Sequence, residues 1–81
     1  MSEEEFNKLL SESLELNDSI SKGICSNDIL DKINNSIEYL NIELEFEVRE
    51  NPTDQLSYYY QKIELCWIYY KLRDYYFTSQ A

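Results

Sequence analysis

The hydrophobic positions of the chain recur at helical spacing in three successive segments. In the first, apolar side chains repeat at intervals of three and four residues from Phe6 onward. Ser2 and Glu5 form a capping-box pattern before this segment, and Gly23 supplies a stop that tolerates a left-handed backbone after it. The pattern therefore predicts a first helix over residues 3–21.

The second segment carries an unbroken helical stripe of apolar residues over about five turns. Either Ser26 or Asn27 can cap its start. It ends by Asn51, because Pro52 disfavours a helical conformation in the residue before it. The stripe consists of Leu30, Ile33, Ile37, Leu40, Leu44 and Val48.

Residues 42–49 also fit a second interpretation, because apolar and polar residues alternate there at period two. Such alternation is typical of a half-buried strand. The chain has no other strand pattern with which this stretch could pair, and the helical stripe passes through it without a break. We favour a helix and keep the strand as the alternative.

The third segment begins with a clear helix start. Asn51 is a capping residue, Pro52 fits the first helical position and Asp54 follows in the first turn, and the helix can run to about Phe77. The short connection makes the second and third helices an antiparallel hairpin. We therefore expect an all-α fold, with one domain over residues 1–81 that consists of a short N-terminal helix and a helical hairpin. The main apolar face of the third helix is predicted to be Leu56, Tyr59, Tyr60, Ile63, Cys66, Trp67 and Tyr70.

Both helices of the hairpin carry a second apolar stripe opposite the first. A helix that is apolar all round is normally buried all round, and one short extra helix cannot cover four stripes. At least one face should therefore remain exposed, and exposed apolar patches usually mark interaction sites. The predicted partner-binding residues are Leu65, Tyr69, Leu72 and Tyr76 in the third helix and Tyr39, Ile42 and Phe46 in the second.

Charge is distributed unevenly along the chain. The net charge is −9, and residues 1–51 hold 13 acidic and 4 basic side chains, whereas residues 52–81 hold three of each. Seven of the eight tyrosines lie in this second part. A chain with this much negative charge is unsuited to binding nucleic acid, which requires a basic surface. We interpret the acidic half as a solubilising part and the neutral, aromatic half as the recognising part.

The residues needed for common catalytic and metal sites are missing. The chain has no histidine, and Cys25 and Cys66 show no metal-binding or redox spacing. We expect no enzyme activity, no metal and no cofactor, with Cys66 a buried thiol. The chain also has no apolar run of membrane-spanning length and begins with an acidic segment, so we expect a cytoplasmic protein that does not bind membranes.

The pattern over residues 30–76 resembles the small co-chaperones of type III secretion needle subunits. Residues 35–50 correspond to a charged, leucine-patterned helix and residues 51–54 to a brief polar turn. Residues 59–72, which open with Tyr-Tyr-Gln-Lys, correspond to a second helix rich in isoleucine and aromatic residues. The resemblance implies a virulence-related protein that binds a helical-repeat chaperone, so that the pair keeps the needle subunit soluble before export.

Two other functions remain open. The acidic first half is also typical of an inhibitor, immunity protein or nucleic-acid mimic that blocks a basic enzyme. Alternatively, the chain forms a homodimeric bundle with a regulatory role. A protein partner, or a second copy when the chain is alone, is expected in each of these functions.

Overall fold

A computed structural model of the chain describes residues 2–50 and 56–80, with the surroundings of the side chains for residues 2–46 and 59–79. It contains three α-helices, α1 (Glu3–Ser21), α2 (Asn27–Glu50) and α3 (Leu56–Gln80). The predicted all-α fold is confirmed. The strand alternative for residues 42–49 is wrong, because α2 continues through them. The predicted cap of the third helix at residues 51–54 lies outside the described residues, and α3 extends past the predicted end.

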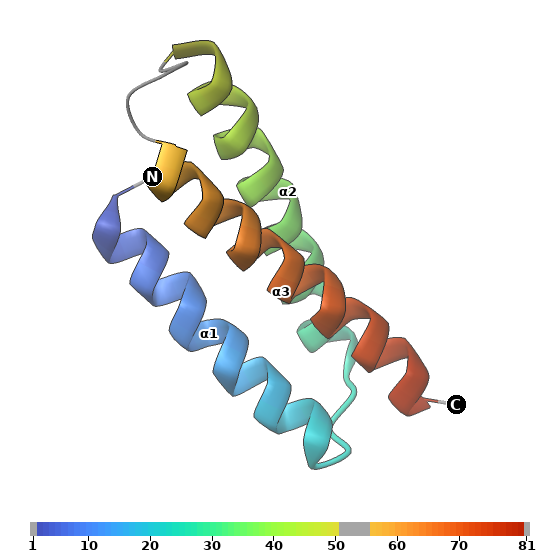
Figure 1. Cartoon of the computed structure of the whole chain (residues 1–81). Helices are drawn as coiled ribbons and strands as arrows, with labels where there is room; N and C mark the ends of the chain where they lie inside the picture. The colour runs from blue at the N-terminus through green and yellow to red at the C-terminus, as the bar shows by residue number, and fades with distance from the viewer. Residues whose placement is uncertain (1, 51–55, 81) are drawn as a thin grey trace.

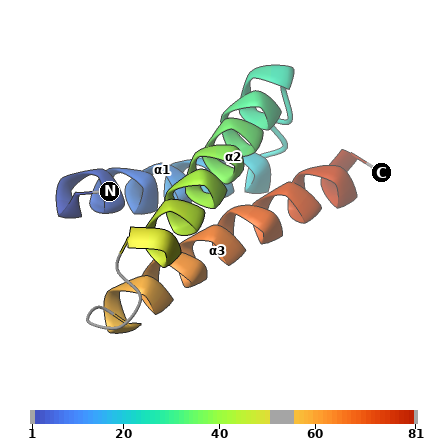
Figure 2. The same cartoon turned by 90° about the horizontal axis from the view of Figure 1, so that it is seen from above.

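The helices form an elongated bundle of 43 × 19 × 17 Å. Figures 1 and 2 show α2 running opposite to α3, and α1 running in roughly the same direction as α3. The hairpin predicted from the sequence is therefore present. Helix α3 packs against both other helices, whereas contacts between α1 and α2 are sparser. This arrangement leaves one long side of α3 without a neighbouring helix.

Local hydrogen bonds fix both ends of α1 and the start of α2. The Ser2 side chain accepts a bond from the backbone N–H of Glu5, as the capping pattern predicted. At the other end, Gly23 has a φ of 82°, its N–H bonds to the Ile20 carbonyl, and the next N–H reaches the Ser19 carbonyl. This pair of bonds is a Schellman motif. The Ser26 hydroxyl accepts from the N–H of Ile29, so Ser26 caps α2.

The core lies where all three helices meet. The predicted apolar stripe of α2 faces it, with Ile33, Ile37 and Leu40 buried and Leu30 and Leu44 partly buried. Helix α1 contributes two buried aliphatic side chains, and α3 contributes residues from the stripe that was expected to be exposed. The core residues are Leu16, Ile20, Ile29, Ile33, Ile37, Leu40, Leu65, Cys66, Tyr69, Leu72 and Tyr76.

Candidate interaction surface on helix α3

The stripe of α3 that was predicted to bind a partner is buried. Leu65, Tyr69, Leu72 and Tyr76 are each at most 4% exposed, so the expectation that this face is uncovered was wrong. The physical reason is that α1 and α2 close over it, and the backbones of α1 and of the Ser26 cap supply acceptors for the tyrosine hydroxyls. Tyr69 donates to the Leu9 carbonyl at 2.7 Å, and Tyr76 donates to the Ser26 carbonyl at 3.1 Å. A buried tyrosine with its hydroxyl bonded in this way is a stable core residue.

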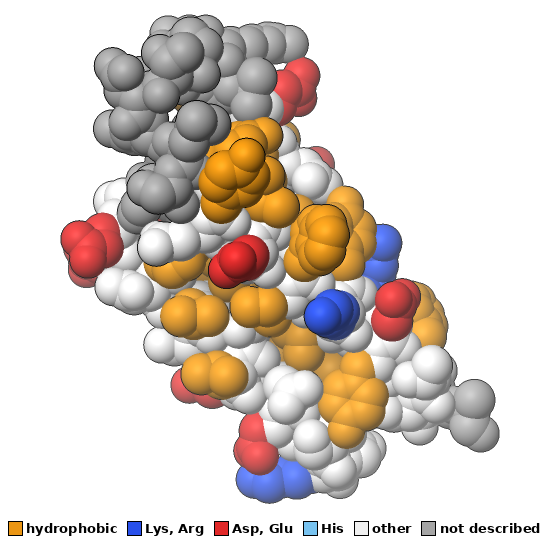
Figure 3. All heavy atoms as spheres, in the orientation of Figure 1, with side chains coloured by type: hydrophobic (Ala, Val, Ile, Leu, Met, Phe, Trp, Pro, Cys, Tyr) orange, Lys and Arg blue, Asp and Glu red, His pale blue; other side chains and the backbone are white. Residues whose placement is uncertain are grey.

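The opposite side of α3 is exposed and aromatic. Tyr60, Trp67, Tyr70 and Phe77 are 59%, 64%, 36% and 52% exposed, and we call these four residues the outer face of α3. The sequence pattern placed three of them in the core. In Figure 3 hydrophobic side chains extend along α3 and over the neighbouring part of α1. The structure therefore exchanges the predicted roles of the two stripes of α3.

The outer face follows a seven-residue repeat. With Ile63 and Asp74 included, its positions are separated by three, four, three, four and three residues, which is the spacing of a coiled-coil seam. Ile63 is half-buried and Asp74 is exposed. The seam runs along an uninterrupted helix, so its side chains are held at fixed distances from one another. Such a face suits a straight helical partner.

Contacts with α2 hold part of this face in place. The side-chain amide of Asn41 donates to the Tyr70 hydroxyl at 3.0 Å. The Arg73 guanidinium lies 5.1 Å from the centre of the Tyr70 ring and also donates to the Asn34 side chain at 3.4 Å. A side chain that is already ordered loses less entropy on binding. Asn41 and Arg73 therefore hold Tyr70 in place on the outer face of α3.

The predicted partner-binding residues of α2 are exposed, but on another side of the bundle. Tyr39, Ile42 and Phe46 are 37%, 59% and 59% exposed. The Tyr39 hydroxyl donates to the Glu5 carboxylate at 2.7 Å, so Tyr39 lies toward α1, whereas Asn41 lies toward α3. This bond raises the pKa of Tyr39 to about 12 and lowers the pKa of Glu5. The three residues form a second, smaller apolar surface.

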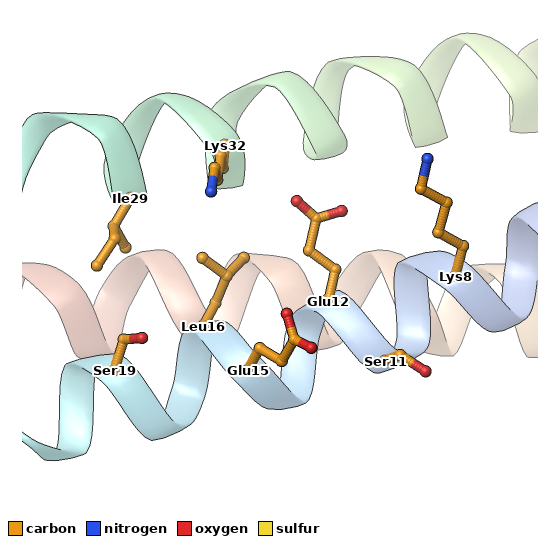
Figure 4. A pocket seen from close by; sticks show the side chains of 8 residues that line it. All are labelled: Lys8, Ser11, Glu12, Glu15, Leu16, Ser19, Ile29 and Lys32. Atoms are coloured by element: carbon orange, nitrogen blue, oxygen red, sulfur yellow. The ribbon is translucent and has the colours of Figure 1, made fainter.

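Open grooves lie beside α1. The groove between α1 and α3 has a volume of about 390 Å³ and includes the apolar side chains Leu10, Leu14 and Ile68 in its lining. The groove between α1 and α2, shown in Figure 4, has a volume of about 470 Å³. Lys8 and Lys32 lie beside acidic side chains of α1 in its lining, so it offers no concentrated charge for a ligand.

The potential metal ligands and the cysteines of the described residues were the remaining candidates for a chemical site. No cluster of three or more potential metal ligands occurs among them. Both cysteines are free thiols, and burial raises the pKa of Cys66, which disfavours its reactive thiolate form. No helix in the described part of the chain is both long and apolar enough to cross a membrane.

One signal in the sequence distinguishes the two stripes of α3. The charged residues Glu64, Lys71 and Asp74 share the side of the helix that carries Trp67. The stripe from Leu65 to Tyr76 contains no charge at its own positions. Since charged side chains are seldom buried, their placement indicates which side faces solvent. Aromatic content alone does not indicate which side faces solvent, because both sides carry tyrosine.

Comparison with known proteins adds no assignment to this geometry. No protein-family model, curated protein or solved structure matches the chain. The functional interpretation therefore depends on the two exposed apolar surfaces and the distribution of charge.

Proposed function

We propose that the protein is a non-catalytic interaction domain that binds a helical segment of a protein partner through the outer face of α3. One observation carries the proposal: four aromatic side chains at coiled-coil spacing are exposed, although the inward side of the same helix is already filled. Folding therefore does not require them to be apolar. Exposed apolar patches mark interaction sites, and Trp and Tyr are enriched among residues that dominate binding energy.

In the particular form that we propose, the protein is a type III secretion co-chaperone, whose partner is a helical-repeat chaperone. Helical-repeat proteins present concave surfaces lined by helices, and an exposed helix face such as that of α3 is suited to them. The separate surface formed by Tyr39, Ile42 and Phe46 supports this form, because a protein that joins a chaperone to a needle subunit needs two contact surfaces.

Coexpression with the products of the genes that adjoin its own tests this proposal. We expect a defined complex with one of them, which Trp67→Ser weakens by about 2 kcal/mol or more. Ile24→Ser is the matched control, because Ile24 is also exposed but lies in the turn after α1 and is not part of the outer face of α3. Equal affinity of the two variants would show that the outer face is not the contact surface.

The charge distribution favours a second candidate function, an acidic inhibitor of a basic enzyme. Residues 1–51 carry 13 acidic and 4 basic side chains, whereas α3 carries two acidic and three basic ones. An inhibitor that binds through this charge loses affinity steeply as salt is added. Binding through the aromatic face of α3 changes little with salt. The affinity of the complex measured at low and high salt therefore separates the two functions.

A further inference from the structure

We infer that the outer face of α3 pairs with the same face of a second copy of this chain, with the two helices antiparallel. The inference rests on the proposed function, because it names an occupant for the same surface. In the absence of its partner, the protein would cover its exposed aromatic side chains in this way. The evidence is the order of residues along the seam and the charges beside it.

The seam is complementary to itself when one copy is reversed. The first and fourth residues of each heptad form the core of a coiled coil. In an antiparallel pair, each first residue lies opposite a fourth residue of the other helix. Reversing α3 about the middle of the seam places Trp67 opposite Tyr70 of the second copy, and Tyr60 opposite Phe77. All four residues are exposed in the single chain. Two aromatic layers therefore form on each side of the two-fold axis.

Asp74 distinguishes the antiparallel arrangement from the parallel one. A parallel pair places equivalent core positions together, so Asp74 would face Asp74 of the other copy. Two carboxylates at one position of a seam repel each other. In the antiparallel pair Asp74 lies opposite Ile63, near one end of the seam, where its carboxylate can reach water. A polar residue at a core position lowers stability but selects the register.

The charges beside the seam fit the same orientation. Glu64 and Lys71 are exposed, follow the seam on one flank, and are seven residues apart, or about 10 Å along the helix axis. Reversal of the second copy brings Glu64 of one chain close to Lys71 of the other, and the two-fold axis repeats the pair. In a parallel pair these two residues do not meet. Opposite charges at such positions set the orientation of coiled coils.

The exposed area limits the strength of the dimer. An aromatic side chain buries about 150–250 Å² when it is fully covered. With about half of that area exposed at four positions, pairing removes about 400 Å² from each copy, or about 800 Å² in total, before the flanking residues are counted. Specific stable interfaces start near 1,200 Å². The dimer is therefore weak and reversible, so a partner can displace the second copy.

The charge of the whole chain acts against the dimer at low salt. Each copy carries a net charge of −9, and like charges repel over distances that salt shortens. Added salt therefore strengthens self-association through the apolar seam. The acidic inhibitor function predicts instead that added salt weakens partner binding. A salt titration therefore distinguishes self-association through the seam from binding through the acidic charge.

Sedimentation velocity over protein concentrations from about 1 μM to about 500 μM, at about 0.15 M salt, tests the pairing. We expect a reversible dimer that Glu64→Lys and Lys71→Glu each weaken about tenfold, because each change places two pairs of like charges side by side. The double variant restores the opposite charges and the affinity of the original chain. Far-ultraviolet circular dichroism checks that each variant keeps its helices.

Two results would overturn the inference: a monomer at every concentration, or a dimer that neither single charge reversal weakens. The coexpression experiment separates this from the proposed function. A monomeric chain whose partner complex is weakened by Trp67→Ser overturns self-pairing alone. If the charge reversals weaken the dimer but Trp67→Ser does not weaken the partner complex, self-pairing is supported and the proposed function is overturned.

Discussion

The hydroxyl of Tyr69 donates a 2.7 Å hydrogen bond to the backbone carbonyl of Leu9, which ties the inward side of α3 to α1. Tyr69 is completely buried, so its hydroxyl has no access to water. A buried hydroxyl without a partner would be costly, and this bond removes that cost. The relationship explains how a helix that is apolar on both sides takes one orientation in the bundle.

Replacement of Tyr69 should separate the hydrogen bond from the packing of the ring. Tyr69→Phe removes the bond to Leu9 and is expected to lower the free energy of unfolding by about 1 kcal/mol. Tyr69→Ala also leaves a cavity and is expected to cost about 3–5 kcal/mol. Urea denaturation measures both changes. Tyr60→Phe is the control, because Tyr60 is exposed, and a loss there equal to that of Tyr69→Phe would contradict the assignment.

Stability should fall in alkaline solution. The pKa of Tyr69 is raised from 10.0 to about 12 by burial, and that of Tyr39 to about 12 mainly by its hydrogen bond to Glu5. A raised pKa in the folded state gives stability that is complete below about pH 10 and is lost as the pH rises toward 12. Unfolding free energies at about pH 9 and pH 11 measure this loss. In the double variant Tyr39→Phe/Tyr69→Phe the loss should be smaller, and an unchanged loss would contradict this origin.

The exchange of roles between the two stripes of α3 predicts opposite effects at two nearby positions. Leu65→Ala removes a buried side chain and should destabilise the fold by about 2–5 kcal/mol. Trp67→Ala removes an exposed side chain and should change stability by no more than about 0.5 kcal/mol. Thermal unfolding of both variants at low protein concentration, where any dimer has dissociated, provides the measurement. A larger loss of stability for Trp67→Ala than for Leu65→Ala would contradict the exposed position of Trp67.

Gly23 should be needed for its backbone conformation alone. Its φ of 82° lies in the left-handed region, and a β-carbon added there meets no atom within 4 Å. Gly23→Ala is therefore expected to cost about 1 kcal/mol through backbone strain without any clash. Gly23→Asn should cost less, because asparagine tolerates this conformation better. Urea denaturation of the two variants checks the order, and a neutral Gly23→Ala would contradict the explanation.

The helices could be predicted from the repeat of apolar residues, but that repeat alone could not predict the orientation of α3. Repeats of three and four residues and the Ser2 cap located α1 and α2, and the stripe containing Ile33 and Leu40 identified the buried side of α2. In α3 apolar residues lie on both sides, so periodicity does not choose between them. The choice depends on α1, which covers Leu65 and leaves Trp67 in solvent.

The candidate site was predicted in part for the same reason. Tyr39, Ile42 and Phe46 are exposed, as the second stripe of α2 indicated, although the hydroxyl of Tyr39 bonds to Glu5 of α1. The larger apolar surface, on α3, was predicted on the side of the helix that the structure shows to be buried. The charges at Glu64 and Lys71 were the available signal, but the prediction rested on the spacing of the apolar residues alone. The resemblance to type III secretion co-chaperones stays a prediction.

Trp67 is the only tryptophan in the chain and lies at the middle of the outer face of α3, so its fluorescence reports directly on that surface. The most direct test follows the emission of Trp67, and its quenching by acrylamide, while the protein associates with itself or with a partner. If the outer face is the interaction surface, the emission moves to shorter wavelength and quenching falls in step with association. Association that leaves both unchanged would contradict this central claim.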